Sequence, residues 1–372
     1  MINTMSIKRF LFAAAVAVLF WSPSSAQEKA VVYHDASAFP LYGKCVEATS
    51  ARYERLPKEF EGVVRKSMWD LGRNSAGLYI RFRSNSTQIR ARWRSLSPRQ
   101  YMPHMADVGD SGLDLYILTE KDGWRFAGSG FEWKGRDKEV KNKTMVSNME
   151  PSMREYMLYL SLYNGISSLE IGVDEEAVIE APSIDSPRSD RPIVMYGTSI
   201  LQGGCASRPG MAFTAILGRK LDREIINLGF SGNAWLDYEI AEYITRAQNP
   251  ALIVLDYVPN STAEMIDERG ERFFRIVRQA FPDVPVIFVE DPTFPHTRFD
   301  KNMLEEVTSK NEAQKALYRR LRKAGEKKLY YVGTEGMIGD DGEATVDGIH
   351  LTDLGMMRYV DKLYPVMRKA LR

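Results

Sequence analysis

The sequence predicts two domains of different fold class, a jelly-roll-like antiparallel β-sandwich followed by an α/β domain built on a parallel sheet. A length of 372 residues fits about two domains. The period of the apolar residues is two over 31–184, as in half-buried strands, whereas short apolar runs alternate with helical stretches beyond. A segment rich in proline and serine divides them, which gives a sandwich over 27–184, a linker over 185–190 and an α/β domain over 191–372.

The first 26 residues resemble an export signal. Lys8 and Arg9 precede an apolar run over 10–21, and a small-x-small tripeptide ends at Ala26. A buried N-terminal helix is the alternative. We therefore expect a signal peptide over 1–26 and an exported protein, periplasmic or secreted. No cysteine lies directly after the run, so we do not expect a lipid-anchored lipoprotein, and no membrane anchor is expected after cleavage.

Net charge and cysteine content give no indication of a nucleic-acid partner or a metal site. The net charge of +1 gives no reason to expect nucleic acid. The two cysteines, Cys45 and Cys205, could form a disulfide in an exported protein or remain free thiols. They form no clustered Cys/His pattern in the sequence, so we expect no metal site.

Three turn signals predict three hairpins in the first domain. Alternating residues flank the turn at 84–86, and Asp-Gly at 122–123 and Asn-Gly at 164–165 mark two more reversals. Arginines from Arg81 to Arg94 alternate with apolar residues around the first turn. We interpret them as the solvated face of that hairpin.

The second domain alternates strands with helices. Strands are expected over 193–196, 224–228, 251–257, 284–290 and 328–332. Helices are expected over 212–221, 235–246, 263–280, 304–324 and 353–371, the last capped by Thr352. This alternation predicts a parallel sheet covered on both faces, with ligands bound at the carboxyl ends of its strands.

Four short motifs fall after those strands or before the last helix. They contribute Ser199, Gly232, Asn260 and the pair Asp347 and His350. A serine hydroxyl needs a base within hydrogen-bond reach to act as a nucleophile. His350 is the best of the four histidines for this task, because Asp347 lies three residues before it and can orient its ring.

The same motifs supply donors for an oxyanion. The candidates are the N–H groups of Ser199 and Gly232 and the side-chain amide of Asn260. Taken singly, each residue has a simpler interpretation. Ser199 could cap a helix, Gly232 could serve a turn, Asn260 could be a turn residue or a glycosylation sequon, and Asp347 with His350 could be a surface pair.

An α/β-hydrolase is the main rival among serine enzymes. Its elbow is Gly-x-Ser-x-Gly, but Leu201 occupies the fifth position here. Its acid and histidine also normally lie far apart in sequence, unlike Asp347 and His350. Both observations argue against that fold.

The second domain resembles the SGNH (GDSL-like) hydrolases, whose four sequence blocks match Ser199, Gly232, Asn260 and His350. The resemblance implies a three-layer, flavodoxin-like fold, ester hydrolysis and no metal or organic cofactor. The chain departs from the usual blocks at Thr198, Val258 and Ser261, none of which is a catalytic position.

A sandwich before such a domain resembles the bidomain carbohydrate esterases, among them the CE2 acetylesterases. The resemblance implies an exported serine esterase that removes short acyl groups, acetyl above all, from oligo- or polysaccharides. The alternatives are a lipid or lysophospholipid acylhydrolase and a non-catalytic carbohydrate-binding protein. The oligomeric state is left open.

Three further residues are candidates for substrate contacts. His104 lies on an expected sandwich loop, His296 follows the fourth strand of the second domain, and Trp235 follows the Gly232 loop. The simpler interpretation is a loop residue without a substrate contact for the two histidines and a packed core residue for Trp235. Asp256, at the end of the third strand, could support the site or be a buried, hydrogen-bonded carboxylate.

Overall fold

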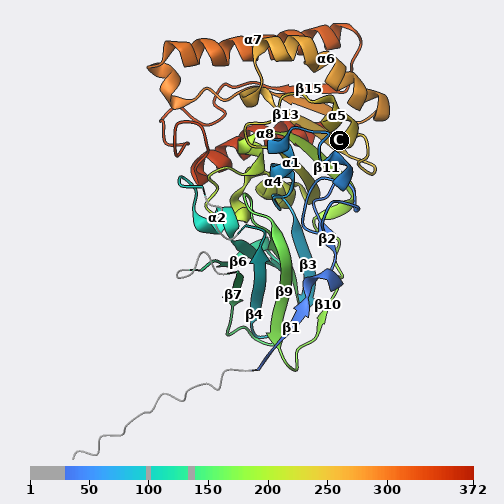
Figure 1. Cartoon of the computed structure of the whole chain (residues 1–372), viewed down its shortest axis with the longest axis vertical. Helices are drawn as coiled ribbons and strands as arrows, with labels where there is room; N and C mark the ends of the chain where they lie inside the picture. Colours follow the sequence, from blue (N-terminus) through green and yellow to red (C-terminus); the bar gives the residue numbers. More distant parts are fainter. Residues whose placement is uncertain (1–29, 98–101, 133–138) are drawn as a thin grey trace, which may run out of the picture.

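A computed structural model describes residues 30–97, 102–132 and 139–372. The predicted signal peptide over 1–26 lies outside these residues. The sandwich and the α/β domain lie end to end, with the sandwich at the bottom of Figure 1 and the long helices at the top. Within the described residues, no helix is both long and apolar enough to span a membrane.

The first domain consists of two antiparallel sheets packed face to face. Their strands are β1 (Val31–Asp35), β2 (Leu41–Tyr42), β3 (Tyr79–Ser84), β4 (Ile89–Ser95), β5 (Leu113–Thr119), β6 (Gly123–Gly130), β7 (Val140–Val146), β8 (Arg154–Tyr159), β9 (Ile166–Asp174) and β10 (Ile179–Glu180). One sheet has the order β1-β9-β4-β7 and the other β10-β3-β8-β5-β6, with β2 paired to β3. Phe82, Trp93 and Leu158 are among the buried residues between them, which confirms the predicted antiparallel sandwich.

Only one of the three predicted hairpins is confirmed. β5 and β6 pair across the turn at 122–123. The prediction is wrong for β3 with β4 and for β8 with β9, because each pair is divided between the two sheets. A turn motif reverses the chain but does not determine which sheet the next strand joins, and both outcomes give the same period-two pattern.

The predicted solvated arginine face is also wrong at Arg81. Its side chain is fully buried, and its guanidinium donates to the carbonyl oxygen of Ile184 and lies 3.7 Å from Glu155. The segment over 183–186 packs over this part of the sheet, with Ser183 hydrogen-bonded to Glu155 and Ser186 to Trp124, so an outward-facing side chain is buried here. The β4 arginines remain half-buried on the outer face of the other sheet.

The second domain contains the predicted parallel sheet. Its strands are β11 (Arg188–Gly197), β12 (Arg223–Gly229), β13 (Leu252–Asp256), β14 (Val286–Val289) and β15 (Leu329–Val332), in the order β12-β11-β13-β14-β15. Its main helices are α4 (Phe213–Leu221), α5 (Tyr238–Ile244), α6 (Ala263–Ala280), α7 (Lys301–Lys323) and α8 (Asp353–Ala370). The α/β prediction is therefore confirmed, although β11 begins inside the segment interpreted as a linker.

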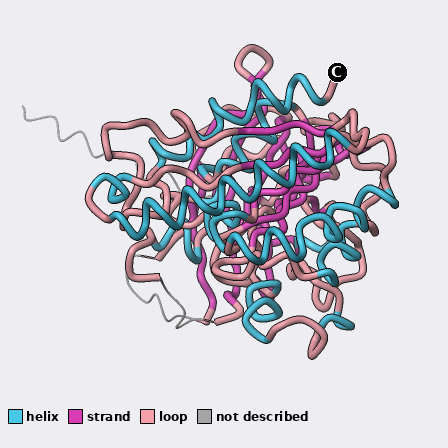
Figure 2. Tube along the Cα trace, turned by 90° about the horizontal axis from the view of Figure 1, so that it is seen from above, coloured by secondary structure: helices cyan, strands magenta, loops and turns pink. Residues whose placement is uncertain are grey.

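Helices cover both faces of this sheet. Residues of α4 and α8 share one core cluster with one face, and residues of α5, α6 and α7 share another cluster with the opposite face. Seen from above, the long helices overlie the strands (Figure 2). The predicted cap of α8 is confirmed, because Thr352 Oγ1 accepts a hydrogen bond of 3.2 Å from the Gly355 N–H.

A segment from the first half of the chain packs into the second domain. It includes the 3₁₀ helix η2 (Lys58–Phe60) and α1 (Lys66–Gly72). Leu56, Met68 and Trp69 belong to the core cluster that also contains α5 and α6 residues. The buried Arg55 donates to the carbonyl oxygens of Asn227 and Gly229 at the end of β12. The sequence pattern gave no indication of this crossing, because the segment follows a sandwich strand and precedes another.

Candidate active site

The site lies at the carboxyl ends of the parallel strands. Ser199 is the first residue of the short helix α3 (Ser199–Gln202), which begins two residues after β11. Thr198 caps this helix, since its hydroxyl accepts a hydrogen bond of 3.2 Å from the Ile200 N–H. The strand and the cap together fix the backbone that carries the Ser199 hydroxyl.

A hydrogen-bonded chain joins Ser199, His350 and Asp347. His350 Nε2 lies 2.9 Å from Ser199 Oγ, and His350 Nδ1 lies 2.7 Å from Asp347 Oδ2. The second oxygen of Asp347 accepts the N–H groups of Ile349 and His350 at 3.0 and 2.8 Å. The loop before α8 therefore orients the carboxylate, which in turn orients the imidazole.

The Asp347 carboxylate is held in its charged form. Partial burial raises its pKa, but hydrogen bonds from the His350 ring and from the backbone of His350 and Ile349 outweigh burial and lower the pKa to about 2. At neutral pH the pair therefore consists of an ionised acceptor and a ring whose Nδ1 carries a proton. That tautomer leaves the Nε2 lone pair facing the Ser199 hydroxyl.

Gly232 follows β12 in a left-handed conformation. Its φ is +65°, and a Cβ built there would meet nothing within 4 Å. The N–H of Ser231 donates to Gln202, and that of Asn233 donates to Phe230. Glycine is thus required by the backbone angle rather than by crowding, and a methyl group at this position would point into open space.

Asn260 closes the 3₁₀ helix η4 (Val258–Asn260) after β13. Its Oδ1 accepts the Ala234 N–H at 3.4 Å, which turns the amide so that Nδ2 remains available as a donor. Ser199, Gly232, Asn260 and His350 all line one open cavity of about 280 Å³. The structure therefore brings the predicted nucleophile, base and oxyanion donors together.

The Gly232 loop is clamped by the segment that crosses from the first half of the chain. Arg65 Nη1 and Ser67 Oγ each donate to Asn233 Oδ1 at 2.7 Å. Arg65 also pairs with Asp237 at 2.7 Å. Sequence reasoning missed this clamp, because nothing in the local pattern around Arg65 indicates the distant loop.

The three candidate substrate contacts have different surroundings. The Trp235 ring is covered by Arg65, whose guanidinium lies 3.7 Å from the ring centroid, and Trp235 is not among the described residues lining the cavity. His296 stacks on Phe294 and abuts Gly348, where an added Cβ would lie 3.1 Å from His296 Nδ1. His104 lies beside His350, with ring centroids 5.2 Å apart.

Charged residues that the sequence did not indicate also line the cavity. Lys310 of α7 lies 2.5 Å from Glu306 and 3.7 Å from Asp291, which follows β14. Burial raises the pKa of Asp291 to about 7, partly offset by Lys310. The position of Asp291 directly after a strand could have indicated a place near the site. Lys310 lies inside a highly charged helix, and nothing in that pattern distinguishes it from the other lysines.

Asp256 is a buried, hydrogen-bonded carboxylate, and the two cysteines are free thiols rather than a disulfide. Asp256 is buried and accepts hydrogen bonds from the Tyr359 hydroxyl at 2.9 and 3.0 Å. Cys45 and Cys205 are both free. Burial raises the pKa of the Cys205 thiol to about 12, so at neutral pH it is a protonated thiol and not a competing nucleophile.

The sandwich holds the loop that follows α3. Asp114 of β5 accepts hydrogen bonds from Arg208 Nη1 at 2.7 Å and from the Gly210 N–H at 2.9 Å. The Tyr116 hydroxyl accepts a second bond from Arg208 at 2.6 Å. Sequence reasoning did not single out this Gly-Leu-Asp-Leu-Tyr run at 112–116.

Comparison with known proteins matches both parts of the chain. The profile of the GDSL-like lipase/acylhydrolase family matches residues 190–368. A profile named GxDLY, for the N-terminus of SGNH-hydrolase-type esterases, matches residues 31–179, which contain the run at 112–116. A search of curated proteins finds no match.

Several solved structures share the whole architecture. A crystal structure from Bacteroides ovatus, of a protein classed as a GDSL-like lipase, is 35% identical, covers 92% of this chain and 98% of its own, and superposes with a TM-score of 0.86. The salicylyl-acyltransferase SsfX3 of a tetracycline biosynthetic pathway is 16% identical (92% and 99% covered, TM-score 0.74). A family two carbohydrate esterase from Cellvibrio japonicus is 11% identical (92% and 98% covered, TM-score 0.56). The last two share the fold.

Proposed function

The chain belongs to the GDSL-like lipase/acylhydrolase family of ester-hydrolysing enzymes, and from this premise we propose that it deacetylates carbohydrates through an acyl-enzyme on Ser199. The observation that carries the proposal is the continuous hydrogen-bonded chain from Asp347 through His350 to Ser199. Serine nucleophiles of this kind are activated by an adjacent, oriented base.

Acylation begins when Ser199 Oγ attacks the ester carbonyl carbon. The hydroxyl proton passes to His350 Nε2 over the 2.9 Å hydrogen bond, and Asp347 stabilises the resulting imidazolium through Nδ1. The negative charge that develops on the carbonyl oxygen is stabilised by the N–H groups of Ser199 and Gly232 and by Asn260 Nδ2.

Collapse of this intermediate breaks the bond to the sugar oxygen. The leaving alkoxide takes the proton from His350 Nε2, which releases the sugar hydroxyl and leaves the acyl group on Ser199. Water then attacks the acyl carbon, gives its proton to His350, and a second collapse releases the carboxylic acid and restores the Ser199 hydroxyl.

Two features support a short acyl group on a polar substrate. The cavity of about 280 Å³ is at the small end of ligand sites. Its lining also includes Glu306, whose side chain is 57% exposed and would have to be desolvated against a long alkyl chain. The architecture shared with family two carbohydrate esterases adds an analogy of fold.

Export is a further part of the proposal. It rests on the basic pair, the apolar run and the small-x-small tripeptide ending at Ala26. Expression of the full chain in a bacterium with a periplasm should yield a protein that begins at Gln27. N-terminal sequencing of the periplasmic fraction checks this, and an uncleaved chain in the cytosol would contradict it.

The activity is tested with p-nitrophenyl acetate, butyrate and octanoate, followed by acetate release from acetylated xylo-oligosaccharides. We expect a preference for acetate, lost in both Ser199→Ala and His350→Ala. Preference for octanoate would instead indicate a lipid acylhydrolase. A folded protein without Ser199-dependent hydrolysis would favour a carbohydrate-binding role.

A further inference from the structure

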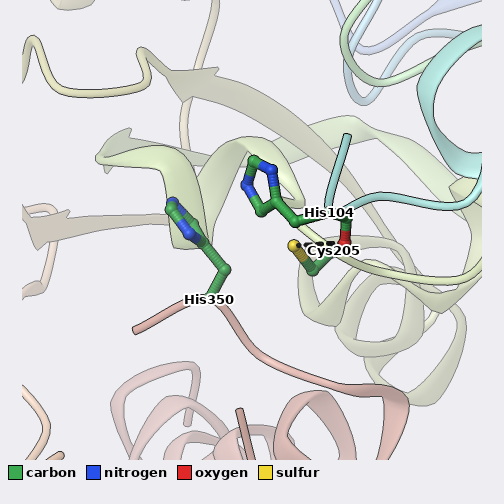
Figure 3. A group of neighbouring side chains, drawn as sticks. All are labelled: His104, Cys205 and His350. Carbon is green, nitrogen blue, oxygen red and sulfur yellow. Dashed lines mark hydrogen bonds between the residues drawn. The ribbon is translucent and has the colours of Figure 1, made fainter. Parts of the chain in front are cut away.

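Three potential metal-binding side chains meet beside Asp347. The ring nitrogens of His104 and His350 and the Cys205 sulfur lie within 4.8 Å of one another (Figure 3). They come from a sandwich loop, from the loop after α3 and from the loop before α8. Their separation in the sequence explains why no metal-binding pattern was visible there.

The donor atoms suit a borderline-soft transition metal. One thiolate and two imidazoles are common zinc ligands, and a tetrahedral ion with bonds of about 2.3 Å to sulfur and about 2.0 Å to nitrogen holds such atoms roughly 3.3 to 3.5 Å apart. To reach that spacing the donor atoms would close from 4.8 Å or less, and His350 would exchange one of its two hydrogen bonds for the ion. Asp347 Oδ2 lies 3.8 Å from His104 Nε2 but outside the group whose atoms all lie within 4.8 Å of one another, so we leave the fourth position to water.

The cluster is held by its surroundings and is open to solvent. Cys205 has a φ of +66°, uncommon for a residue with a side chain, and its thiol donates to the His104 carbonyl oxygen at 3.4 Å. Gly109 packs against Ala206, the residue after Cys205, because a Cβ at Gly109 would lie 2.2 Å from the Ala206 carbonyl oxygen. The side chains of His104 and His350 are 27% and 20% exposed, which leaves a path for an ion.

We propose that His104, Cys205 and His350 form a reversible inhibitory site for Zn²⁺. Binding releases the thiol proton to solvent, and the thiolate and two neutral imidazoles coordinate the ion. The sandwich domain thereby contributes a ligand, His104, to a site that controls the base of the second domain.

Coordination would remove His350 from catalysis whichever ring nitrogen it uses. An ion on Nε2 occupies the lone pair that faces Ser199. An ion on Nδ1 requires the other neutral tautomer, in which the single ring proton has moved to Nε2, so the ring can no longer accept the Ser199 proton. This inhibitory consequence rests on the proposed function, whereas metal binding itself does not.

Binding is measured first, on Ser199→Ala, which keeps all the ligands and needs no activity. Calorimetric titration with Zn²⁺ should give one ion per chain, with a heat that depends on the buffer because protons are released. His104→Ala and Cys205→Ser, each added to this background, should weaken binding on the order of 10- to 100-fold or more. Matched controls are His296→Ala, a histidine against the same loop, and Cys45→Ser, the other thiol.

Co²⁺ gives a second readout that a merely structural role would not produce. A thiolate-to-cobalt charge-transfer band should appear with Ser199→Ala and be absent when Cys205→Ser is added. In the active enzyme, Zn²⁺ should inhibit acetate ester hydrolysis and EDTA should restore it. The zinc inhibition constant of His104→Ala, measured against the zinc-free rate of the same variant, should rise by the same factor as its dissociation constant for Zn²⁺.

Three results would overturn the proposal. One is no Zn²⁺ binding to Ser199→Ala, and another is equal affinity in the His104 and Cys205 variants and in the controls. The third is inhibition that persists unchanged in those variants, which would place the ion on Asp347 and His350 alone. None of these results bears on whether Ser199 hydrolyses esters in the absence of zinc.

Discussion

Each proposed role is set by the hydrogen bonds that a side chain already makes. Asn260 illustrates this, because the Ala234 N–H occupies its Oδ1 and so determines that the group facing the cavity is a donor. Asp347 is used in the same way, with one oxygen on the backbone and the other on His350. The chemistry of the site follows from these fixed orientations.

Replacing Asn260 tests the oxyanion site. Asn260→Ala removes one donor, and loss of a single such donor costs about 10²- to 10³-fold in kcat with little change in KM. Asn260→Asp keeps the shape but presents a negative charge to the developing oxyanion, so its loss should be larger. Steady-state kinetics on p-nitrophenyl acetate measures both, and equal kcat values for Asn260→Asp and the parent would exclude this role.

Replacing Asp347 separates stability from activity along the pH scale. The native pKa of about 2 lies below the usual 3.8, so the stabilisation by the ionised carboxylate is complete above about pH 5 and is lost as pH falls towards 2. The difference in stability between the parent and Asp347→Asn should therefore be present at pH 5 and narrow steadily as pH falls below it. Urea unfolding at successive pH values measures it.

The catalytic effect of the same substitution has a different cause. The amide cannot hold the His350 tautomer that accepts from Ser199, and this change in a serine triad lowers kcat by about 10⁴-fold. The loss should persist at pH 7, where Asp347 is fully ionised in the parent. Activity within tenfold of the parent would show that Asp347 does not orient the base.

At this scale, the sequence indicated roles that depend on local order and missed those that depend on distant contacts. Ser199 follows a predictable strand end, and Asp347 lies three residues before His350. By contrast, Arg65 reaches the Gly232 loop and His104 reaches His350 only through the packing of the two domains. No pattern within one stretch of chain encodes such contacts.

Among the elements, the loop after α3 connects the two domains. Asp114 and Tyr116 of β5 bind its Arg208, while its Ser207 donates to Asp353 at the start of α8. Burial raises the pKa of Asp114 to about 6, although Arg208 opposes this shift. The sandwich therefore supports the loop between the Ser199 helix and the helix that follows His350.

Removing Arg208 should destabilise the protein in a pH-dependent way. Arg208→Ala removes the cation that is hydrogen-bonded to the fully buried Asp114 and leaves it with Arg219 and the Gly210 N–H, and breaking a buried ion pair costs up to about 3–5 kcal/mol. The folded variant favours the protonated carboxyl, so the deficit should be small at pH 5 and grow as pH rises above 6. Urea unfolding at pH 5 and 8 measures this, and the double variant with Asp114→Asn should lose the pH dependence. An equal deficit at both pH values would contradict it.

The hairpins show how far sequence periodicity extends at the level of elements. The strands around 84–86 and 164–165 were located correctly, but their partners were not, because β3 and β8 lie in one sheet and β4 and β9 in the other. A period of two shows that one face of a strand is buried, but it does not show which of the two sheets the strand joins. In the second domain, alternation with helices restricts each strand to one parallel sheet, so the same reasoning succeeded there.

At the scale of the whole molecule, the two domains share one folded unit. The segment containing Leu56, Met68 and Trp69 leaves the sandwich after β2, packs on the second domain and returns to the sandwich at β3. The α/β core is therefore incomplete without residues from the first half of the chain. Loss of either domain's packing should propagate to the other.

This interlocking predicts a single unfolding transition, which one core substitution from each domain can test. Met68 is fully buried in the α/β core cluster and Ile171 in the sandwich core cluster, and truncating such a side chain to alanine costs about 2–5 kcal/mol. In differential scanning calorimetry, Met68→Ala and Ile171→Ala should each lower the midpoint of the same single peak. If the domains were independent, the parent would show two peaks, Met68→Ala would shift one and Ile171→Ala the other. A single peak shifted by both would mean that the sandwich is a structural part of the esterase, whose removal would destabilise the loops that hold Ser199 and Gly232.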